Sequence, residues 1–85
     1  MQEVTVYTRP MCGYCFRALA LLKKKGAPVN EISVAFDRKK RQEMLSRSNG
    51  KTTYPQIFIG DTHVGGSDEL AALERNDKLD ALLNG

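Results

Sequence analysis

The chain has 85 residues, of which 41% are hydrophobic and 27% charged, with a formal net charge of +3. This length allows one small core, and the composition excludes a disordered chain. Two cysteines close together in sequence cannot staple a secreted mini-protein. The first ten residues include Glu3, Arg9 and Pro10, so they form neither a membrane span nor a signal sequence. We expect a single cytoplasmic domain over residues 1–85 with no membrane partner.

Positive charge is concentrated in two runs, residues 23–25 and 38–41. The first run falls at the expected carboxyl end of a helix, where cations complement the helix dipole. We interpret the runs mainly as solvated helix faces, with a basic rim that attracts an anionic substrate as the alternative. No stripe of aromatic residues accompanies the charge, which argues against a nucleic-acid partner.

The amino-terminal half predicts a strand, a helix and a second strand. Residues 3–8 alternate with β-branched and aromatic side chains, which is typical of a strand with Val4 and Val6 on one face. A helix is expected from residue 12 or 13 to 25, with Gly26 as a left-handed cap. The apolar positions of this helix are Phe16, Leu19, Ala20 and Leu22. Residues 29–34 form the second expected strand.

The carboxyl-terminal half predicts two helical regions around a hairpin. Asp37 is the expected amino cap of a charged, partly exposed helix that ends near residue 48. Residues 56–59 and 62–64 read as strands joined by a turn at residues 60–61. A helix follows residues 65–66, and a short last helix carries Leu79, Leu82 and Leu83.

This order of elements limits the topology. The first two strands are joined by a helical crossover and are therefore parallel, whereas the last two form an antiparallel hairpin. The compact solution is an α/β fold in which one mixed four-stranded sheet carries helices on both faces.

The segment Cys12-Gly13-Tyr14-Cys15 lies where the first strand passes into the first helix. Zinc would need two further ligands, and the chain offers only His63, which is expected in the hairpin without a role. An inert structural pair is a second interpretation. A redox centre is favoured, because amides and the dipole at a helix start stabilise a thiolate. Cys12 is then the nucleophile, and the more buried Cys15 resolves a mixed disulfide.

Two further segments are candidates for binding a peptide. Tyr54-Pro55 precedes the strongest strand, and a cis bond there would turn the backbone of Tyr54 outward; a trans turn proline is the alternative. Residues 65–68 make a tight turn into a helix whose N–H groups can bind a carboxylate, while Asp68 can accept from an ammonium. The alternative is simple capping of that helix by Ser67 or Asp68.

Taken together, residues 8–15, 53–59 and 65–68 resemble the glutaredoxins, and in particular the small bacterial dithiol members. The similarity covers essentially the whole chain. It implies a thioredoxin fold with sheet order 2-1-3-4, a cis proline at Pro55 and glutathione as the reducing co-substrate. No tightly bound cofactor is implied.

The resemblance also implies roles for individual residues. Cys12 attacks glutathione mixed disulfides in a monothiol route, and Cys15 joins it in a dithiol route that reduces protein disulfides. The glutathione-binding residues that the resemblance implies are Arg9, Tyr14, Tyr54, Pro55, Gly66, Ser67 and Asp68, with Arg41 as a second partner for the glycyl carboxylate. The implied partners are glutathione and glutathionylated or disulfide-bonded proteins, and the protein is expected to be a monomer.

Two positions depart from the family pattern. Gly13 stands where proline is common, and Tyr54 stands where valine is common. Family members with this CGYC sequence can resemble iron–sulfur carriers, in which two protomers each supply one cysteine, here Cys12, to a [2Fe–2S] cluster completed by two glutathiones. A cluster-bound dimer is therefore the alternative function. A redoxin reduced by thioredoxin reductase is a third, but it leaves the carboxylate-binding residues without a purpose.

Overall fold

The computed structural model describes residues 1–85 and contains four strands and four helices. In chain order these are β1 (Val4–Thr8), α1 (Gly13–Lys24), β2 (Val29–Ser33), α2 (Arg38–Arg47), β3 (Gln56–Ile59), β4 (Thr62–Gly65), α3 (Ser67–Arg75) and α4 (Leu79–Asn84). The predicted order of elements is confirmed. No helix combines the length and the apolar character needed to cross a membrane.

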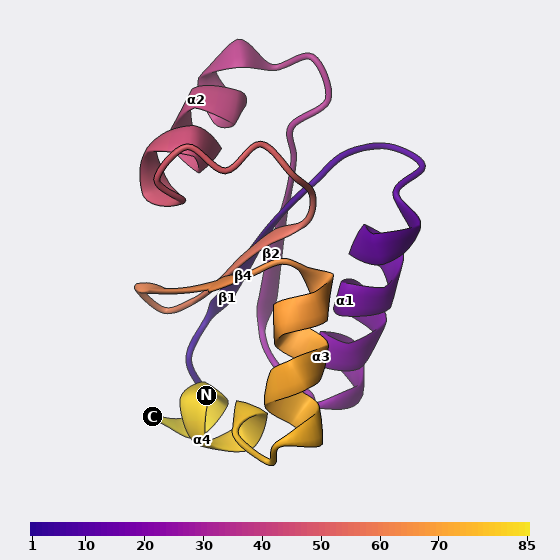
Figure 1. Cartoon of the computed structure of the whole chain (residues 1–85), viewed down its shortest axis with the longest axis vertical. Helices are drawn as coiled ribbons and strands as arrows, with labels where there is room; N and C mark the ends of the chain where they lie inside the picture. The colour runs from indigo at the N-terminus through magenta and orange to yellow at the C-terminus, as the bar shows by residue number, and fades with distance from the viewer.

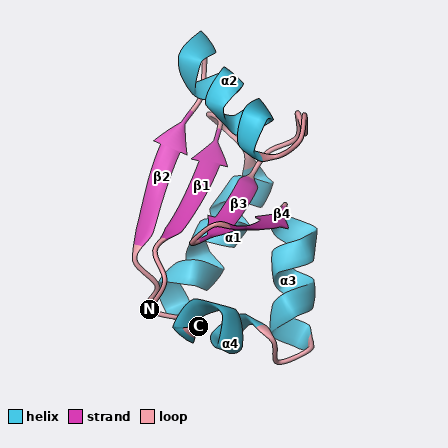
Figure 2. Ribbon diagram, turned by 90° about the vertical axis from the view of Figure 1, so that its left-hand side faces the viewer, coloured by secondary structure: helices cyan, strands magenta, loops and turns pink.

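The strands form one sheet in the order β2-β1-β3-β4, as predicted (Figure 2). β1 is parallel to β2 and antiparallel to β3, and β3 pairs with β4 as a hairpin. All five residues of β1 are buried, because this strand lies inside the sheet with helices over both faces. The parallel pair places the loops that follow β1 and β2 at the same end of the sheet.

Two clusters of apolar side chains lie between the sheet and its helices, one on each face of the sheet. On one face, Val4 and Val6 pack with residues of α1, α3 and α4, among them Leu22 and Leu70. On the other face, Tyr7 and Phe58 pack with Val34 and with Met44 of α2. Figure 1 shows the same division, with α2 apart from the other three helices. Helices on both faces are therefore confirmed.

The buried face of α1 differs from the one predicted. Cys15, Ala18 and Leu22 are buried and follow helical spacing along one stripe. Phe16 is 79% exposed, and Ala20 is also exposed. Phe16 follows the buried Cys15 directly, and Ala20 lies two residues from the buried Ala18 and Leu22. Both are therefore rotated about the helix axis away from the buried stripe. The prediction that Phe16 and Ala20 belong to the core face was wrong.

α2 is attached to the sheet largely through polar side chains. Met44 is its one buried residue, as its narrow apolar face predicted. The Tyr7 hydroxyl donates to the Glu43 carboxylate and accepts from Arg47 Nη1 at 3.1 Å. The Arg47 guanidinium also lies 4.2 Å from the centre of the Phe58 ring. Asp37 caps the helix by accepting from the Lys40 N–H, as expected.

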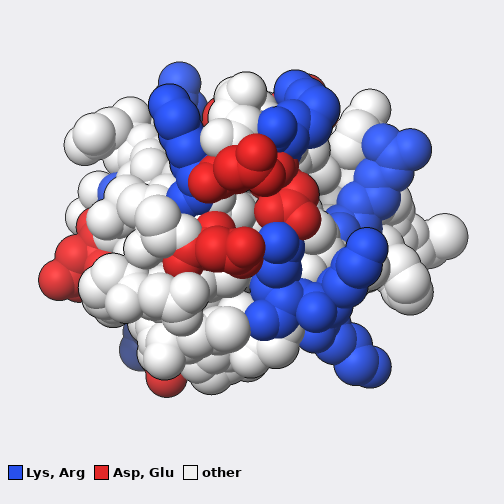
Figure 3. Space-filling view, turned by 90° about the horizontal axis from the view of Figure 1, so that it is seen from below, with Lys and Arg blue, Asp and Glu red and all other residues white.

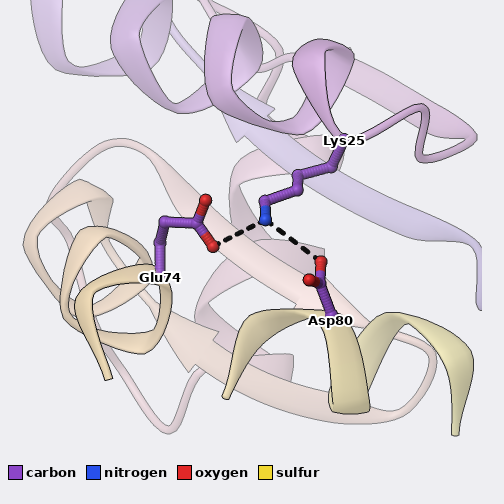
Figure 4. A network of polar contacts seen from close by, with 3 residues as sticks. All are labelled: Lys25, Glu74 and Asp80. Carbon is purple, nitrogen blue, oxygen red and sulfur yellow. Dashed lines mark ion pairs between the residues drawn. The ribbon is translucent and has the colours of Figure 1, made fainter. Parts of the chain in front are cut away.

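The carboxyl end of α1 is tied to the last two helices. Lys25 Nζ contacts the carboxylates of Glu74 at 2.7 Å and Asp80 at 3.1 Å (Figure 4). Figure 3 shows this end of the molecule, where acidic side chains gather beside basic ones. Gly26 adopts a φ of +73°, which confirms its role as a left-handed cap. The run at residues 23–25 is exposed except for Lys25, and it lies one helix length from Cys12.

Candidate active site

Cys12 is the amino cap of α1. Its Sγ accepts a hydrogen bond from the Cys15 N–H at 3.2 Å, so a sulfur occupies the place that a Ser or Asp oxygen usually takes. The turn from β1 into the helix passes through Met11, whose φ of +57° is unusual for a residue with a side chain. The prediction that the first cysteine lies at a helix start, within reach of an amide, is confirmed.

The surroundings of Cys12 favour its thiolate. Partial burial alone would raise the pKa of this thiol. Hydrogen bonds from Cys15 and from Arg9, together with the positive charge of Arg9, outweigh that effect and lower the pKa. Cys12 is also half-buried and lines an open pocket, so its sulfur is accessible. A low pKa and access together are what a nucleophilic cysteine requires.

Cys15 has the opposite properties. Its side chain is only 3% exposed, and burial is the largest of the causes that raise the pKa of its thiol to about 12. The hydrogen bond with Cys12 and the charge on Cys12 add to this effect. The neutral form of Cys15 therefore persists beside an ionised Cys12. This difference is the one that the sequence predicted from the two positions.

The loop before β3 reaches the same sulfur. The bond between Tyr54 and Pro55 is cis, as predicted, and the Tyr54 carbonyl oxygen lies 3.9 Å from Cys12 Sγ. The Arg9 guanidinium lies 5.7 Å from the centre of the Tyr54 ring, within the range of a cation–π contact. The exposed Arg9 thus lies near both the reactive sulfur and an aromatic ring.

A pocket of about 360 Å³ opens beside this loop. Its lining residues are Tyr14, Thr53, Tyr54, Pro55, Gly66, Ser67, Asp68 and Glu69. Six of the seven residues predicted to bind glutathione are therefore brought together. The seventh, Arg9, borders a different pocket next to Cys12. Arg41 is exposed on α2 and lines neither pocket.

The start of α3 forms one wall of this pocket, and its cap differs from the predictions. The amino cap is Gly66, not Ser67 or Asp68, and this residue has no side chain with which to cap the helix. The Glu69 carboxylate accepts instead from the Gly66 N–H at 2.8 Å. The N–H groups of Ser67 and Asp68, in the first turn, are thus left without a side-chain partner.

Glu69 is a pocket residue that the sequence reasoning missed. It follows the cap by three residues, which is the spacing of a capping box and the signal that was available. Gly65 makes room for it: φ is +116° there, and an added Cβ would lie 2.6 Å from Glu69 Oε1. A side chain at residue 65 would therefore displace the Glu69 carboxylate.

Nowhere do three His, Cys, Asp or Glu side chains gather as they would around a metal ion. The chemistry at hand is that of one activated thiol, one buried thiol and a polar pocket beside them. An activated thiol can attack a disulfide, and a second thiol one helical turn away can complete the exchange.

The chain is similar to known proteins of one family. The family model described as Glutaredoxin matches residues 4–64. A glutaredoxin of Pseudomonas aeruginosa is 52% identical over 84 residues, which cover 99% of each chain. The solution structure of a glutaredoxin from Brucella melitensis is 55% identical, with a TM-score of 0.83 over 98% of this chain and 89% of that one. A crystal structure of a buckwheat glutaredoxin–glutathione complex has 27% identity and a TM-score of 0.77 over 98% and 77%. The chain therefore belongs to the glutaredoxin family and has its thioredoxin fold.

Proposed function

We propose that the protein is a glutathione-dependent thiol–disulfide oxidoreductase that reduces both glutathione mixed disulfides and protein disulfides. The observation that carries this proposal is the contrast between the two thiols. Cys12 accepts an amide hydrogen bond and has a lowered pKa, whereas Cys15 is buried and has a pKa of about 12. Cys12 is thus the nucleophile, and Cys15, one helical turn away, stays protonated until a mixed disulfide forms on Cys12.

Glutathione is proposed to bind in the pocket beside the Tyr54 loop. The free N–H groups at the start of α3 suit the carboxylate of its γ-glutamyl end, and Asp68 suits the ammonium. The backbone of Tyr54 is proposed to pair with the cysteinyl part, next to Cys12. Tyr14 and Pro55 would line the groove. The buckwheat relative in complex with glutathione supports this choice of ligand.

The glycyl carboxylate is assigned to Arg9, with Arg41 as a second partner. Arg9 lies beside Cys12, and its guanidinium has five N–H donors, more than the contact with Cys12 uses. Arg41 projects from α2, so its participation requires a ligand that extends beyond the pocket.

In the monothiol route, the Cys12 thiolate attacks the glutathionyl sulfur of a mixed disulfide. The old S–S bond breaks, and the partner leaves as a thiolate that takes a proton from water. A second glutathione, as thiolate, then attacks the glutathionyl sulfur on Cys12. Glutathione disulfide is released, the Cys12 thiolate is restored, and both electrons come from glutathione.

In the dithiol route, Cys12 attacks a protein disulfide and becomes bonded to one of its sulfurs. Cys15 then gives its proton to water and attacks the Cys12 sulfur as a thiolate. The bond between Cys12 and the substrate breaks, the substrate sulfur leaves as a thiolate that takes a proton from water, and a Cys12–Cys15 disulfide remains. Bonding of Cys12 removes its negative charge, which is one of the causes that raise the pKa of Cys15. The second thiol therefore becomes easier to ionise when it is needed.

The two cysteine variants test the proposal. We expect Cys12→Ser to abolish reduction of both a glutathionylated peptide and a protein disulfide. Cys15→Ser should keep the first activity and lose the second, because only the dithiol route needs a second thiol. Equal losses in the two variants would contradict the division of roles. Reduction by thioredoxin reductase but not by glutathione would contradict glutathione dependence.

A glutathione-ligated [2Fe–2S] dimer is the second candidate function, and Gly13 is the observation that favours it. A Cβ at this exposed position would meet nothing within 4 Å, so neither packing nor backbone conformation requires glycine there. Within one chain, Cys12 is the only accessible thiolate ligand. A cluster would therefore be held by Cys12 of two protomers and two glutathione thiols, and it would supply electron-transfer or cluster-delivery chemistry.

Anaerobic reconstitution with iron, sulfide and glutathione tests this second function. A brown dimer that is lost in Cys12→Ser would support it, and Gly13→Pro should weaken the dimer while keeping the disulfide activity. A colourless monomer under the same conditions would contradict it.

A further inference from the structure

A second groove opens at Cys12, on the side that faces β2. It has a volume of about 610 Å³ and is bordered by both cysteines. It shares no residue with the pocket beside the Tyr54 loop. A neighbouring pocket of about 480 Å³ also touches Leu19 and Glu31, so the groove continues along the junction of α1 and β2. The reactive sulfur therefore borders a space outside the pocket proposed for glutathione, and Arg9, which is assigned to the glycyl carboxylate, is the one proposed glutathione-binding residue that lines it.

The groove has apolar walls that are open to solvent. Met11 is 104% exposed and Phe16 is 79% exposed, and both line it together with the partly buried Leu19. Large apolar side chains gathered on a surface are typical of a contact with another polypeptide. Because the fold does not bury Phe16, its position beside Cys12 is available to a partner.

The groove also carries one fixed negative charge. Glu31 lies on β2, and its carboxylate accepts a hydrogen bond from the Thr8 hydroxyl at 3.0 Å. Glu31 takes part in neither of the two ion pairs of the chain, both of which are made by Lys25. Arg9 is the one basic residue that lines this groove, and it forms no ion pair with Glu31. A carboxylate without a paired cation complements a basic side chain of a partner.

The backbone next to the groove suits an extended segment. β2 is an edge strand that pairs only with β1 (Figure 2). Its outer N–H and C=O groups are free of the sheet, and such edges accept an added strand. The groove and the strand edge together offer more surface than a small thiol could cover, so they suit a polypeptide.

We propose that this groove binds the polypeptide part of protein disulfide substrates, as an extended segment that places a large apolar side chain over Phe16 and a basic side chain at Glu31. The inference rests on the proposed function. It assigns the groove to the dithiol route, in which a polypeptide is bonded to Cys12 before Cys15 attacks. The two cysteines still supply the electrons, and glutathione then reduces the Cys12–Cys15 disulfide from its own pocket on the other side of Cys12.

A comparison of two substrates tests the groove. One is a short peptide closed by a disulfide, with Leu and Lys beside its cysteines; the other is the mixed disulfide of glutathione and 2-mercaptoethanol. Phe16→Ser should lower kcat/KM for the peptide by about tenfold and leave the small substrate unchanged, because only the peptide fills the apolar wall. Phe36→Ser is the matched control, since Phe36 is fully exposed but lines neither groove.

The charge on Glu31 provides a second test. Glu31→Lys should reverse the preference between peptides with Lys and with Glu beside the cysteine, by about fivefold in each direction. Equal losses for both substrates in Phe16→Ser, or no reversal in Glu31→Lys, would overturn the inference. Failure of the proposed function would look different: the wild type would not reduce the small mixed disulfide with glutathione.

Discussion

The two ends of α1 are built in opposite ways. At its amino end the cap is a sulfur, the neighbouring side chains Met11 and Phe16 are exposed, and pockets open on both sides. At its carboxyl end the N–H groups of Gly26 and Ala27 donate back to the helix, and Lys25 is paired with two carboxylates. A helix of 12 residues separates these ends by about 18 Å.

This contrast shows how a small protein divides stability and reactivity. The carboxyl end satisfies its polar groups within the chain, which anchors α3 and α4 against α1. The amino end leaves an accessible sulfur and exposed apolar side chains for substrates. The same helix therefore carries the anchor at one end and the reaction at the other.

The largest expected effect is the difference in reactivity between the two thiols. In Cys15→Ser the remaining Cys12 should react with iodoacetamide at neutral pH, because its pKa is lowered. In Cys12→Ser, burial still disfavours the thiolate of Cys15, and we expect alkylation about a hundredfold slower. As the pH falls, the Cys12 rate should decline only below the pKa of an ordinary thiol. Similar alkylation rates in the two variants would contradict the proposed difference in pKa between Cys12 and Cys15.

Arg9 should have the next largest effect. Arg9→Gln removes a hydrogen bond and a positive charge that lower the pKa of Cys12. Alkylation of Cys12 at pH 7 should slow by about fivefold to tenfold, and the pH profile should move to higher pH. Arg75→Gln is the control, since Arg75 lies in the last turn of α3, away from either cysteine. An unchanged profile would limit Arg9 to binding of the glycyl carboxylate.

Tyr54 should act on the same sulfur through Arg9. Its ring is half-buried against the α2 side of the core, and the Arg9 guanidinium lies over it. Tyr54→Leu should slow alkylation of Cys12 by about twofold to threefold, because the cation–π contact no longer holds Arg9. Tyr54→Phe keeps the ring and should match the wild type. In an Arg9→Gln background, Tyr54→Leu should not slow alkylation further. A further decrease in rate would show that Tyr54 affects Cys12 independently of Arg9.

The sequence predicted the fold and the reactive pair because both depend on local patterns. Alternating β-branched residues, the caps at Asp37 and Gly26, and the spacing of Cys12 and Cys15 are each readable over a few positions. The parallel pairing of β1 and β2 then follows from the helical crossover between them. Of the site, local patterns could place Cys12 at the helix start and the turn before α3, whereas the cis proline was implied by the resemblance to the glutaredoxins.

The errors concern contacts between distant segments. Phe16 is apolar, yet it faces outward, because the stripe that meets the sheet is set by Cys15, Ala18 and Leu22. The pairing of Lys25 with α3 and α4 depends on how the helices pack, and no local pattern contains it. Such partners are separated in sequence and are fixed only by the tertiary structure.

The smallest expected effect lies at the carboxyl end of α1. Lys25→Met removes both ion pairs while keeping the length of the side chain, and it should lower the Tm by a few degrees without changing kcat/KM for a glutathione mixed disulfide. High salt should reduce the difference in Tm, because screening weakens exposed ion pairs. Lys24→Met is the matched control: Lys24 is its exposed neighbour in the last turn and has no ion pair. A loss of activity in Lys25→Met at unchanged Tm would show that the two ends are coupled, and that the anchor also sets the geometry at Cys12.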